Sequence, residues 1–160
     1  MKKNIAIFTG GLVIGIVLSA IIVLSYIMPR NASSMFMLQE QEIVKQGEEA
    51  YKAYLHEETP VSIWALERYV DALNRIIEER TSADVDDPYF MLHPEIDLVL
   101  AHGRLGILYR GDDNIEKSQY HFNQALSYAA KRDKNYIRTE EELISYLRQI
   151  DSIQLKKDRY

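Results

Sequence analysis

The chain has 160 residues, no cysteine and a formal net charge of −5 at pH 7. This length accommodates one domain plus an accessory segment. The lack of cysteine excludes disulfides, thiolate catalysis and zinc–thiolate sites. The negative net charge argues against a nucleic-acid partner, because nucleic acids are bound by clustered Lys and Arg.

The N-terminal segment has the composition of a membrane anchor. Residues 5–28 form an uncharged, largely apolar run, and a helix of that length is roughly 36 Å long, enough to cross a bilayer with some tilt. A cleaved signal peptide is the alternative, but its apolar region spans about 7–15 residues and ends at a small-x-small site. This run is longer and is followed by Pro29 and Arg30. We therefore expect an uncleaved single-pass anchor over residues 1–29 and a polar tether over 30–34.

The charges that flank the anchor predict its orientation. Lys2, Lys3 and the amino terminus precede it, whereas an acid-rich stretch that begins at Glu40 follows it. Because positive charge is retained in the cytoplasm, we expect a cytoplasmic N-terminus. The body would then lie outside the cytoplasm, on the periplasmic side of an inner membrane.

Three small residues in the anchor fall four residues apart: Gly11, Gly15 and Ser19. Small side chains at this spacing let two membrane helices approach closely, so one hypothesis is a helix partner in the membrane, including a second copy of the chain. The other is that glycine is simply frequent in membrane helices.

The body, residues 35–155, is predicted to be all-α, because apolar residues recur at helical spacing and strand-type alternation is absent. One helix hairpin is expected over about 35–80, with a break at residues 56–60, and a second over 94–132. A C-terminal helix, 139–155, would cap the second hairpin, and residues 156–160 form a polar tail.

Helix starts are marked by two candidate capping boxes. Thr139 is followed three residues later by Glu142, the pattern in which each side chain satisfies a backbone N–H at the helix start. Asp113 and Glu116 repeat the pattern less completely, with Asp in the Ser/Thr place. We expect Asp113 to cap the second helix of the second hairpin.

An internal repeat links the two hairpins. The pattern small, aromatic, small, leucine occurs twice with an offset of 53 residues, as Ala65, Tyr69, Ala72, Leu73 and as Ser118, Phe122, Ala125, Leu126. The small residues would allow a neighbouring helix to approach, and the aromatic ring would fill the space between helices.

The second copy, together with Leu105, Gly106 and Tyr109 before it, resembles the tetratricopeptide repeat (TPR). The match covers Val99 to Arg132, close to the period of that family. It departs at two positions, since Ala130 stands where the family ends its repeat with proline and His102 replaces a large aromatic residue. The first pair is more degenerate: Gly47 and Tyr51 precede it, followed by an insertion of about six residues.

The resemblance implies a protein-binding module, in which the first helices of successive hairpins line a concave face. On this chain that face would carry Leu100, Arg104, Ile107 and Arg110. The two arginines are candidate contacts for an acidic partner. The alternative is that they only solvate a helix face.

No pattern for catalysis or for a cofactor is found, so the chain is not expected to be an enzyme. His56 lacks the second histidine, four residues on, of a zinc-binding helix. His102 and His121 are expected to approach each other, but two histidines without a third ligand make a weak metal site.

The sequence favours a membrane-anchored TPR-like adaptor or assembly factor of a cell-envelope complex, with other proteins as partners. The alternative is a small accessory subunit of a membrane-bound enzyme, held mainly through its transmembrane helix. Cleavage of the anchor would instead give a secreted binder.

Overall fold

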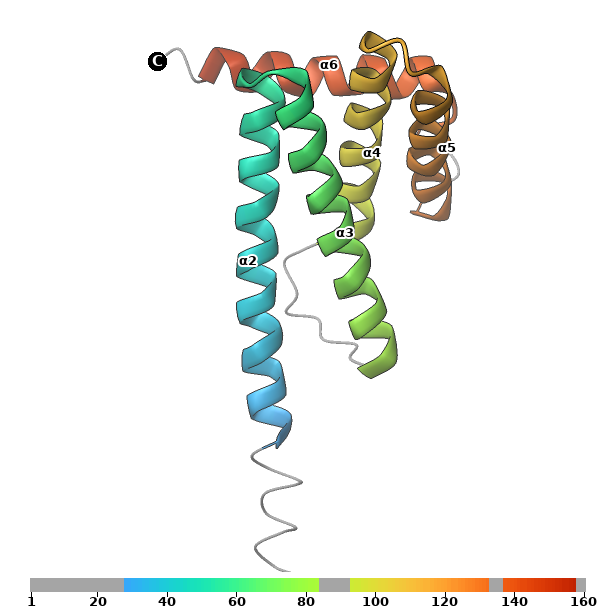
Figure 1. Cartoon of the computed structure of the whole chain (residues 1–160). Helices are drawn as coiled ribbons and strands as arrows, with labels where there is room; N and C mark the ends of the chain where they lie inside the picture. Colours follow the sequence, from blue (N-terminus) through green and yellow to red (C-terminus); the bar gives the residue numbers. More distant parts are fainter. Residues whose placement is uncertain (1–27, 84–92, 133–136, 158–160) are drawn as a thin grey trace, which may run out of the picture. The chain divides into compact units, whose positions relative to one another are not determined.

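The computed structural model describes residues 28–83, 93–132 and 137–157. Within these ranges the chain forms five helices and no strand, so the all-α prediction is confirmed there (Figure 1). The helices are α2 (Met28–His56), α3 (Thr59–Ala83), α4 (Pro94–Gly111), α5 (Ile115–Arg132) and α6 (Glu140–Lys157).

Residues 1–27 of the predicted anchor, including Gly11, Gly15 and Ser19, lie outside the described residues. None of the helices in the described ranges combines the length and the apolar character needed to cross a bilayer.

The chain divides into two units, Met1–Gln41 and Glu42–Tyr160. The described part of the first unit is the beginning of α2, and the features discussed below belong to the second unit. Because α2 begins at Met28, residues 30–34, predicted as a tether, are helical. Pro29 is compatible with this start, since a helix's first N–H groups have no intrahelical partner and proline lacks one.

Helix α4 lies at the centre of the second unit. Ten of its eighteen residues are buried, because it packs against α3 on one side and α5 on the other. A helix that is apolar around most of its circumference is expected in such a central position. Two hydrophobic clusters meet on it: Leu98, Ala101 and Leu105 belong to the cluster shared with α2 and α3, and Val99 to the cluster shared with α5 and α6.

Helices α4 and α5 approach each other closely because residue 106 is a glycine. A Cβ atom at Gly106 would lie 2.8 Å from the ring of Phe122, a residue with no exposed surface. Ser118 Oγ donates a hydrogen bond of 2.8 Å to the Gly106 carbonyl oxygen. The residues that carry the sequence resemblance are therefore the ones that hold this hairpin together.

The hairpin of α2 and α3 contains the same kind of contact. A Cβ atom at Gly47 would lie 2.7 Å from the Tyr69 ring, so a glycine on the first helix again faces an aromatic residue on the second. Tyr69 and Phe122 are equivalent positions of the internal repeat. The repeat in the sequence thus corresponds to a repeated packing contact.

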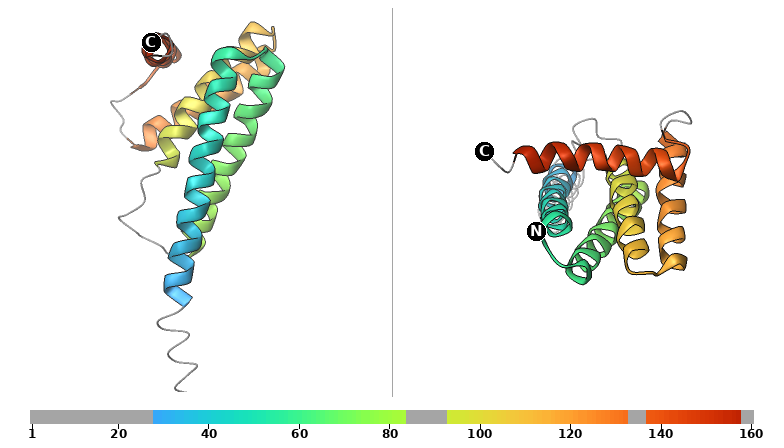
Figure 2. Two further views of the ribbon diagram at one scale, coloured as in Figure 1. Left: turned by 90° about the vertical axis from the view of Figure 1, so that its left-hand side faces the viewer. Right: turned by 90° about the horizontal axis from the view of Figure 1, so that it is seen from above.

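Helix α6 runs across α4 and α5 rather than alongside them (Figure 2). Its apolar stripe, Leu143 and Leu147, is completely buried, and a Cβ atom at Gly103 of α4 would meet Leu147 at 2.7 Å. Helix α6 thereby covers the hydrophobic cluster that α4 shares with α5.

One of the two predicted caps is confirmed. Thr139 Oγ1 accepts a hydrogen bond from the Glu142 N–H at 3.2 Å, and Glu142 Oε2 accepts one from the Arg138 N–H at 2.8 Å. The other is corrected: Asn114, not Asp113, caps α5 by accepting the Lys117 N–H. Asp113 instead adopts a φ of 55° in the turn, a conformation that Asp tolerates better than most residues.

Candidate functional site

A groove of about 820 Å³ runs between α2 and α3. It is lined on α2 by residues on successive turns from Glu42 to His56, by Glu57 just after the end of α2, and on α3 by residues between Val61 and Tyr69. These two faces are left open because the apolar stripe of α3 turns the other way, toward α4.

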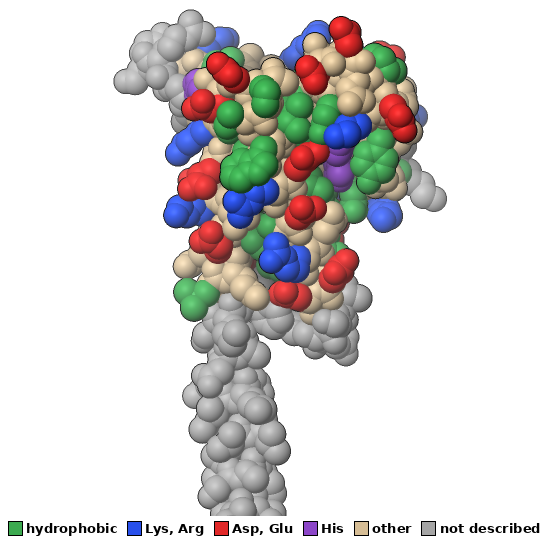
Figure 3. Space-filling model, viewed as in Figure 1, with side chains coloured by type: hydrophobic (Ala, Val, Ile, Leu, Met, Phe, Trp, Pro, Cys, Tyr) green, Lys and Arg blue, Asp and Glu red, His purple; other side chains and the backbone are tan. Residues whose placement is uncertain are grey.

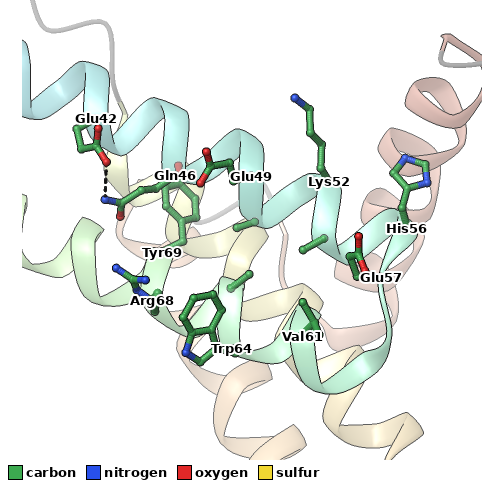
Figure 4. A pocket seen from close by; sticks show the side chains of 13 residues that line it. Glu42, Gln46, Glu49, Lys52, His56, Glu57, Val61, Trp64, Arg68 and Tyr69 are labelled. Atoms are coloured by element: carbon green, nitrogen blue, oxygen red, sulfur yellow. Dashed lines mark hydrogen bonds between the residues drawn. The ribbon is translucent and has the colours of Figure 1, made fainter.

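The groove has a large apolar side chain on its edge. Trp64 is 59% exposed and Val61 is also exposed, and the guanidinium of Arg68 lies 5.0 Å from the centre of the Trp64 ring. Figure 4 shows Trp64 and Arg68 together on α3, facing the acidic and amide side chains of α2. Tryptophan and arginine are enriched at the energetic centres of protein interfaces.

Acidic side chains dominate the α2 wall. Glu42, Glu49 and Glu57 line the groove, and Gln46 donates a hydrogen bond to Glu42 Oε1. The side chain of Lys52 points away from α3 (Figure 4). Apolar, acidic and basic side chains lie close together on the face that carries α2 and α3 (Figure 3). The groove is thus an apolar strip whose α2 side carries three acids together with Lys52 and His56, and one of these acids, Glu49, is ion-paired with Lys45.

The residues predicted for the partner face lie elsewhere, on α4. Leu100 and Arg104 come together at a smaller groove of about 320 Å³, together with Val44 of α2 and Ile150 of α6. Helix α6 therefore contributes one wall of the smaller groove that these two residues line.

Arg104 is only 6% exposed, and its contacts are internal. Its Nη2 donates to Asp151 Oδ1 at 2.8 Å, and the guanidinium carbon lies 4.2 Å from the centre of the Tyr51 ring. Tyr51 donates its own hydroxyl to the same Asp151 oxygen at 3.0 Å. Burial, reinforced by Asp151, raises the pKa of Tyr51 to about 12. Arg104 thus joins α4 to α6 and α2.

The other two predicted contacts occupy different surroundings. Ile107 is half-buried and packs against the second hydrophobic cluster. Arg110 is exposed, forms an ion pair with Glu140 at the start of α6, and lies 4.7 Å from the centre of the Phe122 ring. Of the four residues, Leu100 and Arg104 line the smaller groove, and Ile107 and Arg110 do not.

A second cluster of polar groups lies between α4 and α5. His102 and His121 are 4% and 8% exposed, and their Nδ1 atoms are 2.9 Å apart, as the sequence led us to expect. One ring must donate Nδ1–H and the other accept it, so at least one of the two rings is neutral. Burial lowers the pKa of both, that of His102 to about 4. The described residues hold no group of three or more side chains arranged for a metal ion.

Aromatic rings enclose this histidine pair. His102 stacks on Tyr128 and His121 on Tyr109, with ring centres 6.0 and 5.4 Å apart. The Tyr109 hydroxyl donates to Glu67 Oε1 at 2.6 Å and accepts from Lys117 at 3.1 Å. The pair and its neighbours border a polar cleft of about 520 Å³ between α3, α4 and α5.

Sequence reasoning missed two features of these sites. Trp64 lies off the apolar stripe of α3, and a large aromatic residue in such a position was the available signal of an exposed contact. Asp151 falls four residues after Leu147 on the buried stripe of α6. An acidic residue on a buried stripe requires a cationic partner, so a buried ion pair of Asp151 was predictable, whereas its partner Arg104 was not.

Comparison with protein families, with curated proteins and with solved structures yields no match for this chain.

Proposed function

We propose that this chain is a membrane-anchored protein-interaction module, an adaptor or assembly factor of a cell-envelope complex, whose partner binds in the α2–α3 groove. The observation that carries the proposal is the groove itself, with Trp64 exposed on its edge and acidic residues along one wall. Trp64 and Val61 both expose apolar surface along this groove, and tryptophan is enriched at the energetic centres of protein interfaces.

The repeated glycine–aromatic contact supports the TPR-like part of the proposal. Gly47 faces Tyr69 as Gly106 faces Phe122, so the two hairpins share a packing rule as well as a sequence pattern. We propose that they are two degenerate repeats and that α6 caps the second, since its apolar stripe covers the inner side of α4. Solenoids of this kind end in atypical units.

The N-terminal segment supplies the membrane part of the proposal. With residues 1–29 as the anchor and the N-terminus in the cytoplasm, the body would stand at the outer side of the inner membrane. Anchoring raises the effective concentration of the body for neighbouring membrane proteins, so a groove of modest affinity suffices.

The face predicted on α4 is the weaker candidate for the partner contact. Arg104 is engaged by Asp151 and Arg110 by Glu140, so both arginines have acidic partners within the chain. Partner binding by Leu100, Ile107 and Arg110 stays a prediction, and the α2–α3 groove is the stronger candidate because its apolar residues are exposed.

The alternative is an accessory subunit of a membrane-bound enzyme that is held through its transmembrane helix. The observation in its favour is the spacing of Gly11, Gly15 and Ser19, which suits helix pairing in a bilayer. Its predictions differ from those of the groove, so one experiment separates the two.

The test is co-purification of the full chain, tagged at its C-terminus, after mild detergent extraction from its own membranes. Trp64→Ala is expected to remove the partner, and Ile153→Ala, an exposed apolar residue of α6, to retain it. Loss of the partner with Gly11→Leu and Gly15→Leu but not with Trp64→Ala would overturn the groove as the contact and support the accessory-subunit reading.

A further inference from the structure

We infer that the α2–α3 groove receives a single amphipathic α-helix of the partner protein, apolar along its seam and basic along the edge that meets α2. The inference rests on the proposed function, because it names the chemistry of the partner that this groove would bind.

The floor of the groove is made of small side chains. Ala50 and Ala53 of α2 and Ala65 of α3 all line it, and Ala50 is completely buried. Two packed helices with small residues between them leave a trough in which the side-chain ridge of a third helix fits, with axes about 8–10 Å apart. Trp64 and Val61 stand beside this floor as the apolar contacts for that ridge.

A helix fits the groove better than an extended segment. An extended peptide gains affinity by pairing its backbone with a free sheet edge, but both walls here are helices, whose backbone groups are already paired within α2 and α3. The groove therefore offers side chains, which is how a helix-in-groove partner is recognised.

The length of the groove sets the length of the occupant. The lining residues of α2 run from Glu42 to His56, which corresponds to roughly 21 Å along the helix axis at 1.5 Å per residue. An occupant of about four helical turns covers this distance.

The charges of the two walls set its orientation. On the α2 side the three acids Glu42, Glu49 and Glu57 outnumber Lys52, and Arg68 lies on the α3 side beside Trp64. Basic residues of the occupant would face α2, and its other edge would be neutral or acidic where it meets Arg68. Charges at the rim of an interface steer association and fix register, and their effect falls with ionic strength. Since the whole chain has a net charge of −5, a second copy is the less suitable occupant.

The experiment selects helices from a phage-displayed library of 16-residue amphipathic peptides with a leucine seam and randomised flanks, against the full chain in dodecyl maltoside. Trp64 is the only tryptophan, so its fluorescence reports occupancy of the groove directly. Selected peptides are expected to carry Lys or Arg on one flank, to shift the Trp64 emission to shorter wavelength and to protect it from acrylamide quenching.

Charge-reversal variants test the orientation. The double substitution Glu49→Lys and Glu57→Lys is expected to weaken the best selected peptide roughly tenfold, since two favourable contacts become repulsive. Glu78→Lys, an exposed acid of α3 outside the groove, is the matched control and should leave affinity within about twofold. The loss should shrink at high salt.

Four results would overturn the inference. The first three are enrichment of peptides with acidic or uncharged flanks, binding of peptides that leave Trp64 fluorescence unchanged, and an equal loss of peptide affinity in the Glu78→Lys control. The fourth is a Trp64 shift that grows with protein concentration in the absence of peptide, which would identify a second copy as the occupant. If Trp64→Ala still abolishes co-purification of the natural partner, the proposed function stands while the helical, basic occupant is rejected.

Discussion

Acidification is expected to destabilise the fold through the buried histidine pair. In the folded chain His102 and His121 share one hydrogen bond between their Nδ1 atoms, which requires at least one neutral ring. When both rings are protonated, both become donors and two positive charges face each other in a buried place. The hairpin of α4 and α5 is therefore expected to weaken at low pH.

The size of the effect follows from the pKa of His102. Burial, together with the neighbouring His121, lowers it from 6.5 to about 4. A histidine whose pKa is lower in the folded state contributes stability that is fully present above 6.5 and is lost as the pH falls toward about 4. The gap corresponds to about 3 kcal/mol, a large fraction of the stability of a small domain.

Other titratable groups change the size of the stability loss at low pH but not its sign. For His121, burial is the main cause of the lowered pKa, whereas Glu67 raises it and Lys117 lowers it. Asp97 acts in the opposite sense, because burial raises the pKa of its carboxyl group and this favours the folded state as the pH falls. A comparison with a variant that lacks both histidines removes such background terms.

The assay is urea unfolding of the full chain in dodecyl maltoside, followed by far-ultraviolet circular dichroism at pH 7.5 and 4.5. The variant His102→Asn with His121→Asn keeps an amide hydrogen bond near the Nδ1 positions but does not titrate. The unmodified chain should lose about 2–3 kcal/mol more than the variant between the two pH values. An equal loss in both proteins would refute the role of the pair.

Two further predictions concern the packing around α4. Gly106→Ala should lower the free energy of unfolding by about 1–3 kcal/mol, because its Cβ atom would lie 2.8 Å from an aromatic ring. Gly111 has open space around it, so the control Gly111→Ala should be neutral or slightly stabilising in thermal melts. Asp151→Ala should cost about 3–5 kcal/mol because it leaves the guanidinium of Arg104 buried without its anion. If Arg104→Met with Asp151→Leu is as unstable as Asp151→Ala in urea unfolding, the uncompensated charge is not the cause.

Local sequence patterns were sufficient for the helices and for the contact between the helices of the second hairpin. The positions of Ser118 and Phe122 relative to Gly106 are set by helical periodicity and a short turn, so their contact follows from spacing alone. The same holds for the approach of the two histidines, which lie on facing helices of one hairpin.

The candidate sites were harder to predict because they depend on which helices meet across long stretches of chain. Periodicity places Arg104 on a face of α4, but it does not say that α6 will cross that face and bring Asp151 to it. Trp64 was missed for a related reason: its exposure depends on which side of α3 meets α4, and only the packed structure shows this.

The ion pair between Arg104 and Asp151 has a consequence for biosynthesis. Asp151 comes 47 residues after Arg104, and its carboxylate also receives the hydroxyl of Tyr51, one hundred residues earlier in the chain. A nascent chain therefore cannot neutralise Arg104 until residue 151 has left the ribosome. A polypeptide truncated by a premature stop codon before this residue lacks both the anion of Arg104 and the end of α6, so we expect proteases to degrade it faster than a chain that contains them.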